Sequence, residues 1–545
     1  MRRLGILPAL AIALCAAPAT AQRPADHGTA VIVFGQEATL PVPLYLRGKA
    51  NQDAADLMYL RLARVGSDLV TSGDRGFEPE LARSWARRDS VTLAFELDPR
   101  ARWHDGRSVS ARDVVFSFER ARDGKTAPQH TVLLRRIESV AAEGDHQVVI
   151  RFTQSYGEQL YDATRHVQIL PAHLLESLPA DQIPGSSFAQ RPVGNGPYRF
   201  VRRDPGRQME LAAVPEFFLG APRIDRVVLL LARDPEAQLN LILDGTADAL
   251  ESISPISNIP RVEARGDYRL VPVPTFILGY LLFNHRAYGD RSAPHPILAD
   301  VEVRRALAMG LDRTRMVRAT FGNYSAVPQG PVAQLHWIRD PDMRSSRYDP
   351  AAAGRLLDAR GWRDSDRDGI RDRDGHSLTL RLSFPGTSSA RVHLAAQVQE
   401  QLRGIGVGIE LVRLDGPVWA ERRNRGEFDI DFSSASMDPS PGGLTQSWSC
   451  AGLGGSNVAQ YCNPRVDSLM ASAILATGDA REAWRRVLLA INADAPAVFM
   501  FAPTNVAVIH RRYDNVTLRP ESMWSSLWRW RVTPGRQIAR DRGSP

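Results

Sequence analysis

Residues 103–118 read WHDGRSVSARDVVFSF, and this stretch decides more about the fold than any other. Ser110 is of the type that favours the N-cap of a helix, and Asp113 follows three residues later, as in a capping box. The apolar residues that follow predict a helix through Phe118, and Gly124 lies beyond its expected end. A capped helix is therefore expected to begin at Ser110.

Strand-like and helical segments alternate on both sides of this helix. The runs that predict strands are residues 91–97, 147–152, 198–202, 226–231 and 377–383. Helix starts, each with a capping side chain before a proline, are predicted at Asp234-Pro235, Asp349-Pro350 and Asn463-Pro464. No repeat of about 20–50 residues stands out, which argues against solenoids and propellers. The pattern predicts a mixed α/β protein with several lobes.

The composition is that of an ordinary globular protein. Of 545 residues, 43% are hydrophobic and 24% are charged, which excludes collagen-like and wholly disordered chains. At about 150 residues per domain, the length predicts roughly two to four domains. The formal net charge is +7, and basic residues occur as pairs such as Arg422-Arg423 and not as long runs. Because nucleic-acid binding needs basic residues gathered on one surface, no nucleic-acid partner is expected.

The first residues have the pattern of a secretory signal peptide. Arg2 and Arg3 precede an apolar run over residues 4–17, and Ala19-Thr20-Ala21 then matches the small-x-small cleavage pattern. The run is shorter than the ~20 apolar residues of a membrane-spanning helix. We expect residues 1–21 to be removed after Ala21 and the mature protein to be periplasmic. Lipidation at Cys15 is the alternative, although leucine precedes it where a small residue is expected.

Two cysteines remain after the predicted cleavage. Cys450 and Cys462 lie twelve positions apart in a segment rich in glycine, serine and asparagine. An even pair in an oxidising compartment predicts a disulfide that closes a short loop. A pair of metal ligands is the alternative, but no histidine lies near either cysteine in the sequence.

Catalytic signatures are missing from the sequence. No Gly-x-Ser-x-Gly elbow, His-Glu-x-x-His zinc motif, Cys-x-x-Cys pair, phosphate loop or dinucleotide-binding glycine motif occurs. Neither of the two lysines, Lys49 and Lys125, completes a Ser-x-x-Lys motif. We therefore expect a protein that is not an enzyme and needs no catalytic cofactor. A secreted hydrolase with a Ser-His-Asp triad assembled from distant positions remains an alternative.

An acidic run resembles a calcium-binding loop in all but one position. Calcium loops place oxygen ligands at positions 1, 3, 5, 7 and 9, glycine at 6 and a bidentate glutamate at 12. The candidate ligands are Asp364, Asp366, Asp368, the carbonyl of Ile370, and Asp372. Position 6 is Gly369, but position 12 is Gly375, so the bidentate ligand is missing. A structural calcium site and a solvated hairpin turn are both open interpretations.

Several segments, in order along the chain, share the signatures of one known family. Residues 81–85 (LARSW) with 103–118, and residues 193–200 (VGNGPYRF), carry the most distinctive of these signatures. Further matches are residues 282–284, 303–307, 311–313, 348–350, 361–362 and 461–467. Together they resemble the extracellular solute-binding protein family 5, the dipeptide, oligopeptide and nickel group of ABC-transporter binding proteins.

This resemblance implies the large three-domain variant of the two-lobed, type II periplasmic-binding-protein fold. The lobes would be joined by a hinge and close over a ligand. Domain I would comprise residues 22–55, 186–275 and 505–545, domain II residues 56–185, and domain III residues 276–504. The family's partners imply a peptide or small-molecule ligand and an ABC permease in the inner membrane, and we expect a monomer.

The resemblance also suggests ligand contacts. In peptide-binding relatives an aspartate before the Cys-to-Cys loop pairs with the ligand's amine, but that position here is Ala435, beside Ser434. Asp438 is the replacement candidate, although it also suits a turn before Pro439. Arg391 and His393, at an expected helix start, are candidates for an anionic ligand group.

Three aromatic residues, Trp419, Trp448 and Tyr280, are candidates for walls that bury apolar ligand surface, with core packing as the alternative for each. The family resemblance implies a receptor for peptides or peptide-like solutes, although Ala435 departs from the pattern of the peptide-binding relatives. A metal chelate, opine or oligosaccharide is the alternative ligand, and a periplasmic sensor or chaperone is an alternative role on the same fold.

Overall fold

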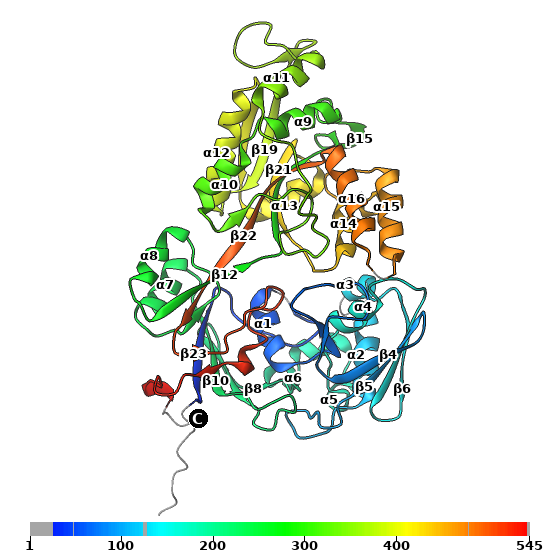
Figure 1. Ribbon diagram of the computed structural model, residues 1–545, viewed down its shortest axis with the longest axis vertical. Helices are drawn as coiled ribbons and strands as arrows, with labels where there is room; N and C mark the ends of the chain where they lie inside the picture. Colours follow the sequence, from blue (N-terminus) through cyan, green and yellow to red (C-terminus); the bar gives the residue numbers. More distant parts are fainter. Residues whose placement is uncertain (1–25, 47, 124–127, 478, 542–545) are drawn as a thin grey trace, which may run out of the picture.

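The protein consists of two lobes stacked along its long axis (Figure 1). The computed structural model describes residues 26–46, 48–123, 128–477 and 479–541. The mixed α/β class and the two-lobed fold expected from the sequence are confirmed. Within the described ranges, no helix is both long and apolar enough to cross a bilayer. The predicted signal peptide, Cys15 and Gly124 lie outside the described residues.

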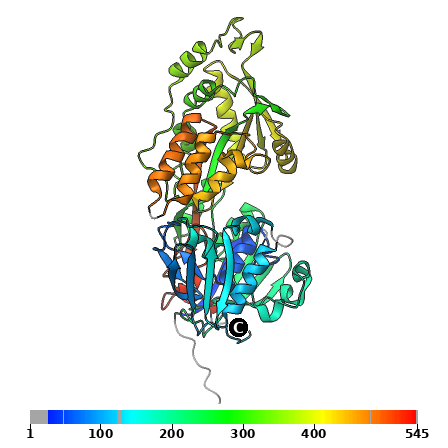
Figure 2. The ribbon, with the colours of Figure 1, turned by 90° about the vertical axis from the view of Figure 1, so that its right-hand side faces the viewer.

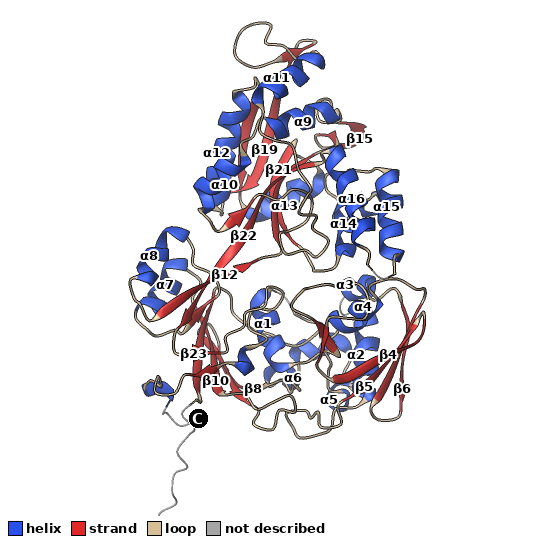
Figure 3. Ribbon diagram, in the orientation of Figure 1, coloured by secondary structure: helices blue, strands red, loops and turns tan. Residues whose placement is uncertain are grey.

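One large sheet passes through both lobes (Figure 3). Its strands in the lower lobe are β1 (Gly28–Phe34), β8 (Tyr198–Asp204), β9 (Gln208–Ala213), β10 (Ile224–Leu231), β11 (Ala249–Leu250) and β12 (Tyr268–Pro274). Those of the upper lobe are β13 (Ile277–Phe283), β16 (Ser325–Ala326), β19 (Thr379–Pro385), β20 (Gly408–Leu414) and β21 (Ile430–Ser436). The long strand β22 (Ala497–His510) belongs to both, and the order is β20-β19-β21-β13-β22-β11-β1-β10-β9-β8.

The two connections between the lobes lie side by side. β22 pairs with β13 through Ala497–Phe501 and with β12 through Thr504–His510. The other crossing is the short link from β12 to β13, where Thr275 Oγ1 donates a hydrogen bond to the carbonyl of Pro503 at 2.8 Å. We call the described residues of 26–274 and 505–541 lobe 1, and those of 277–503 lobe 2. The predicted division of lobe 1 into domains I and II remains a prediction.

Lobe 1 carries a second sheet, of four antiparallel strands. These are β4 (Ala82–Asp89), β5 (Thr92–Leu97), β6 (Ile137–Glu143) and β7 (Gln147–Phe152), in the order β4-β5-β7-β6. Helix α2 (Ala111–Arg122) packs against it and begins as the sequence predicts. The backbone N–H of Ser110 donates to Asp113 Oδ2 at 2.8 Å, which completes the capping box. The helix ends four residues beyond the predicted Phe118.

In lobe 2, helices cover both faces of the sheet (Figures 2 and 3). They are α9 (Val301–Met309), α10 (Arg313–Phe321), α11 (Pro350–Ala359), α12 (Ser389–Arg403), α13 (Gly416–Arg425), α14 (Leu444–Trp448), α15 (Pro464–Leu475) and α16 (Arg481–Asp494). The predicted caps Asp349 and Asn463 accept hydrogen bonds from the backbone at the starts of α11 and α15. Two apolar cores result, one on each face of the sheet.

The predicted strand at 377–383 is displaced in the structure. β19 runs from Thr379 to Pro385, whereas β18 (His376–Ser377) belongs to a small hairpin with β17 (Asp372–Arg373). Glycine at position 375, with φ of 77°, makes the tight turn between β17 and β18. The sequence therefore located the segment correctly but merged two strands into one.

The two most distinctive family segments contact each other. Gly194 N donates to His104 Nδ1 at 3.1 Å, and His104 Nε2 is 3.0 Å from the carbonyl of Gly196. Burial lowers the pKa of His104 to about 4, so the imidazole is neutral and can accept at one nitrogen while it donates from the other. Asn195 N and Gly196 N both donate to the Met58 carbonyl, at 3.0 and 2.8 Å. This segment therefore fixes the end of α1 (Lys49–Met58) against the rest of lobe 1.

Candidate ligand-binding site

The carboxyl ends of two parallel strands in lobe 2 face lobe 1. β19 and β21 pair in parallel, and β21 runs antiparallel to β13, with Ser436 opposite Ile277. Because β13 starts at the hinge, the last residues of β21 lie at the side of lobe 2 that faces lobe 1. In open α/β sheets, ligands bind outside the carboxyl ends of the strands. This edge of lobe 2 is therefore the place to examine for ligand contacts.

Arg391 lies at this edge, in the first turn of α12. Ser388 caps the helix by accepting from Arg391 N at 3.3 Å, and Arg391 Nη2 donates to Ser434 Oγ at 2.7 Å. Its Nε is buried and has no hydrogen-bond partner within the described residues. Burial lowers the pKa of the guanidinium, although the charge of Asp431 opposes that shift, and the described salt bridge of Asp431 is with Arg423. The structure thus brings Arg391 and Ser434 together and leaves donor capacity for an acceptor from outside.

His393 does not join this pair. It follows Arg391 by two residues on the same helix, which places the two side chains about 200° apart around the helix axis. His393 is exposed, whereas Arg391 is half-buried. A ligand held at Arg391 would therefore not meet His393 on the same helix face, and the predicted role of His393 stays a prediction.

Trp419 is held by a carboxylate that sequence reasoning missed. Asp431, fully buried in β21, accepts from Trp419 Nε1 and from Arg423 Nε, each at 2.8 Å. Tyr280, on the neighbouring strand, is 7% exposed and packs edge-on against Trp448 with ring centroids 6.3 Å apart. Both aromatic side chains thus have partners inside lobe 2, as the core-packing alternative expects, and their ligand contacts stay predictions. An acidic residue inside an apolar strand was the available signal for Asp431.

Asp438 already has partners in this arrangement. Its carboxylate accepts from the hydroxyl of Tyr161 and, at 3.0 Å, from Ser440 N, and Arg165 Nε lies 3.9 Å away. The contact from Ser440 N makes Asp438 the turn former that the sequence allowed. Tyr161 and Arg165 belong to α4 (Gln159–Arg165) of lobe 1, so Asp438 joins the two lobes. Ala435 of β21 is half-buried and lies opposite Leu278 of β13, and its side chain has no charge that could pair with an amine. Binding of a ligand amine by Asp438 stays a prediction.

Lobe 1 presents a charged group at the edge that faces lobe 2, where α1 lies (Figure 1). Lys49 Nζ is 2.8 Å from Asp53 Oδ2 and 3.5 Å from Glu251 Oε2. Glu251 directly follows β11, and Asn505 of β22 donates to it at 3.1 Å. Burial raises the pKa of Asp53 to about 7, although Lys49 opposes that shift. Sequence reasoning missed this group because no local pattern connects its members.

A groove of about 890 Å³ runs between the lobes on the side away from the hinge. Lobe 1 contributes Val132 and Leu133 from α3 (Pro128–Leu133), both exposed at 54% and 37%. Lobe 2 contributes Met470 and Ile474 of α15 and the loop around Leu453. The walls of this groove are thus largely apolar, which suits a ligand that carries apolar surface.

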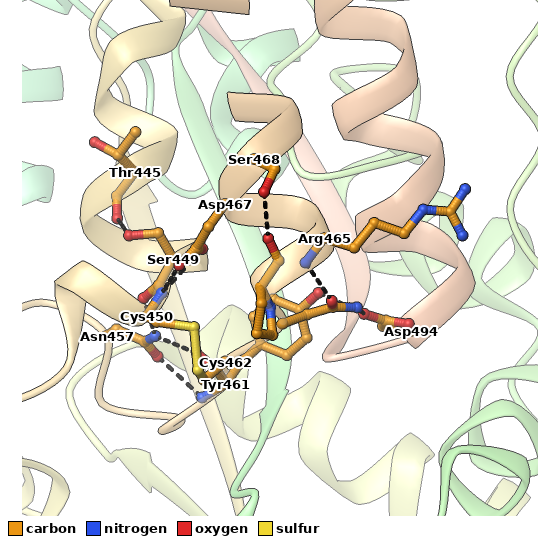
Figure 4. Close-up of a disulfide and its surroundings, with 12 residues drawn as sticks. Thr445, Ser449, Cys450, Asn457, Tyr461, Cys462, Arg465, Asp467, Ser468 and Asp494 are labelled. Atoms are coloured by element: carbon orange, nitrogen blue, oxygen red, sulfur yellow. Dashed lines mark hydrogen bonds between the residues drawn. A yellow bond between two sulfur atoms is a disulfide. The ribbon is translucent and has the colours of Figure 1, made fainter. Parts of the chain in front are cut away.

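The predicted disulfide is confirmed, so the two cysteines are not a pair of metal ligands. Cys450 and Cys462 are bonded in the loop between α14 and α15 (Figure 4). Inside this loop, Asn457 Nδ2 donates to the carbonyls of Ser449 and Tyr461, at 2.9 and 2.6 Å. The bond thus holds one wall of the inter-lobe groove in place.

Removal of this disulfide is expected to lower the free energy of unfolding. Loop-closure entropy for a loop of this size gives about 2–4 kcal/mol for a Cys450→Ser, Cys462→Ser double variant. Thermal denaturation with and without dithiothreitol tests this. Reductant should lower the melting temperature of the wild type and leave the double variant unchanged. Equal melting temperatures for the wild type in both conditions would contradict the prediction.

Three of the predicted calcium ligands come together. The carboxylates of Asp364, Asp366 and Asp368 offer oxygens that lie within 4.8 Å of one another, and all three residues are exposed. Asp372 is elsewhere engaged, since its carboxylate accepts from Ser365 N and Ser365 Oγ, at 2.9 and 2.7 Å. The predicted hairpin turn is also present, through β17 and β18. Calcium binding stays a prediction, and the loop lies at the end of lobe 2 far from lobe 1 (Figure 1).

Comparison with known proteins identifies the family. The chain is 24% identical to the oligopeptide-binding protein AppA of Bacillus subtilis, over 97% of each chain. The solved structure of that protein with a nonapeptide matches with a TM-score of 0.74 at 22% identity, covering 93% of this chain and 99% of the other. NikZ from Campylobacter jejuni, solved with Ni(L-His), matches with a TM-score of 0.76 at 22% identity, covering 92% and 99%. Residues 76–455 match the sequence profile of bacterial extracellular solute-binding proteins, family 5 (middle region). The chain belongs to family 5 of the bacterial extracellular solute-binding proteins.

Proposed function

We propose that this protein is a periplasmic receptor that captures peptides or peptide-like solutes between its lobes and delivers them to an ABC permease. It acts as a monomer and releases its ligand chemically unchanged. The predicted signal peptide supports the location, and the oligopeptide-binding name of the AppA relative supports the ligand class. The permease belongs to the proposal because solute-binding proteins of this group work with one.

The proposal rests chiefly on one observation: the buried Nε of Arg391 has no hydrogen-bond partner within the described residues. Burying a guanidinium with an unpaired N–H is costly unless an acceptor completes its hydrogen bonds. A carboxylate is the natural acceptor, since it can take two N–H groups of the planar fork. The start of α12 adds favourable partial charge for an anion at the same place. We therefore assign Arg391, with Ser434 beside it, to the free carboxylate of the ligand.

Among the described residues at this edge of lobe 2, we assign no comparable partner to the ligand amine. Ala435 occupies the position where peptide-binding relatives carry an aspartate, and Asp438 is bonded to Tyr161 of the other lobe. The proposed ligand is therefore recognised by its carboxylate, with no requirement for a free amine. A metal chelate of an amino acid is the second candidate, because its carboxylates suit Arg391 equally and a similar fold was solved with Ni(L-His).

Calorimetric titration with matched ligands tests this assignment. Peptides of three to nine residues would be compared with their N-acetylated and C-amidated forms, and with Ni(L-His). We expect N-acetylation to be tolerated and amidation to weaken binding by about 10- to 100-fold, as a lost charge-assisted hydrogen bond of ~1.5–3 kcal/mol implies. Equal affinity for the amidated and free peptides, or binding of Ni(L-His) alone, would contradict peptide capture through the carboxylate.

A further inference from the structure

The lobes also contact each other at a second place, on the opposite side of the molecule from the hinge strands β12 and β22 (Figure 1). Here Ser440 of lobe 2 donates to Glu158 Oε2 of lobe 1 at 2.8 Å. Trp337 Nε1 of lobe 2 donates to Thr71 Oγ1 of lobe 1 at 3.0 Å, and the Thr71 hydroxyl in turn donates to Glu158. The hydroxyls of Ser440 and Thr71 thus both donate to the carboxyl group of Glu158, which lies at the centre of the contact.

The surrounding contacts are close, and several of the residues that make them are buried. Tyr161 donates to Asp438 across the same interface. A Cβ added to Gly157 would lie 2.5 Å from the carbonyl of Ala476 in lobe 2, so the two backbones are in direct contact. Thr71 and Tyr161 are fully buried and Glu158 is 9% exposed. We call this set the clasp: Thr71, Glu158 and Tyr161 of lobe 1 with Trp337, Asp438 and Ser440 of lobe 2.

Glu158 has no cationic partner in the clasp. Its described partners are the hydroxyls of Thr71 and Ser440, and the carboxylates of Asp162 and Asp438 lie nearby. Burial, and then the charge of Asp162, raises the pKa of Glu158 to about 8, from an ordinary value of 4.5, although the hydrogen bonds from Thr71 and Ser440 oppose this shift. An ionised carboxylate in this position would face two like charges without a compensating cation.

The other charged groups at the clasp already have partners. Arg165 lies 3.9 Å from Asp438, and His166 lies 3.3 Å from Asp162 on the same helix. Asp162 also accepts from Tyr156, whose ring is stacked by Arg136. From lobe 2, His336 faces Asp438, and burial lowers the pKa of this histidine to about 4, which leaves it neutral.

We propose that the clasp couples closure of the lobes to protonation of Glu158. The lobes close when Glu158 takes one proton from solvent, and they open when Glu158 is ionised in water. Glu158 is then a positioning residue: it touches no ligand and acts through the closure that retains one. This role of Glu158 in closure does not depend on which solute the protein binds.

The direction of the pH effect follows from proton binding. The closed form binds a proton at Glu158 up to about pH 8, whereas an exposed glutamate releases it near its ordinary value of 4.5. The closed form therefore binds more protons in this window, and closure weakens as pH rises. A freed His336 would take up a proton below about pH 6.5 and act in the opposite direction. The effect of Glu158 is consequently read between pH 6.5 and 8, where the closing constant should fall on the order of tenfold.

Single-molecule fluorescence transfer on the ligand-free protein tests this. Dyes on Glu119→Cys of α2 and Glu400→Cys of α12 would report the distance between the lobes, since both positions are exposed and the native pair is disulfide-bonded. The wild-type closed population should fall between pH 6.5 and 8. Glu158→Gln is neutral at every pH, as the protonated acid is, and it can accept from one hydroxyl while its amide N–H donates to the other, so it should stay closed across this range.

Two further variants complete the design. Glu158→Ala removes both hydroxyl contacts and should open the lobes at every pH. Glu263→Gln, an exposed position of lobe 1 outside the clasp, should titrate like the wild type. A wild-type closed population that does not change between pH 6.5 and 8, or a Glu158→Gln protein that titrates like the wild type, would overturn the proposal.

Discussion

Alanine in place of Arg391 is expected to weaken binding of a peptide with a free carboxylate by about 10- to 100-fold. The loss corresponds to a charge-assisted hydrogen bond of ~1.5–3 kcal/mol between the guanidinium and the ligand. Folding stability should change little, because the variant removes one hydrogen bond to Ser434 and a half-buried cation whose Nε has no partner in the described structure. Calorimetric titration gives the affinity, and thermal denaturation gives the stability.

Two variants control this experiment. Arg391→Lys should recover only part of the affinity, because an ammonium group lacks the planar fork that meets both carboxylate oxygens. Glu400→Ala changes an exposed residue near the other end of the same helix and should bind like the wild type. If Arg391→Ala binds as tightly as the wild type, or if Glu400→Ala is the weaker binder, the assignment of the carboxylate to Arg391 is wrong.

Gly194→Ala is expected to have the largest effect on folding, with a loss of about 3 kcal/mol in the free energy of unfolding. An added Cβ would lie 2.0 Å from the Met58 carbonyl oxygen. That oxygen already accepts from Asn195 N and Gly196 N, so the backbone that would have to move also ends α1. Urea denaturation followed by circular dichroism measures the loss.

Gly416→Ala is the matched control. This glycine begins α13, and an added Cβ there would meet nothing within 4 Å. Alanine should be neutral or slightly stabilising, since it restricts the unfolded chain and favours a helix. The same urea midpoint for both variants would show that lobe 1 tolerates a side chain at Gly194 and would contradict the packing described here.

Local patterns predicted the elements whose geometry depends on neighbouring residues. The capping box at Ser110 and Asp113 was correct because its hydrogen bonds join residues three positions apart. The disulfide was also predictable, since only two cysteines follow the expected cleavage site. Arg391 was placed through the family resemblance, and its capped position at the start of α12 agrees with that placement.

The partners that depend on tertiary structure could not be predicted in this way. Trp419 was a candidate for a cleft wall, with core packing as the alternative, and the sequence did not indicate that its indole N–H donates to Asp431, a partner set by how α13 packs on the sheet. Glu158 and Ser440 meet although 282 positions separate them in the sequence. No periodicity or spacing carries that information, because it arises only when the two lobes close on each other.

Native mass spectrometry of protein purified gently from the periplasm tests the central claim most directly. The mass of the intact complex would be compared with the small molecules released on denaturation. The account predicts peptides or peptide-like compounds that carry a free carboxylate and are recovered unchanged. A released solute without a carboxylate, such as a neutral oligosaccharide, or conversion of added peptides into fragments, would contradict it.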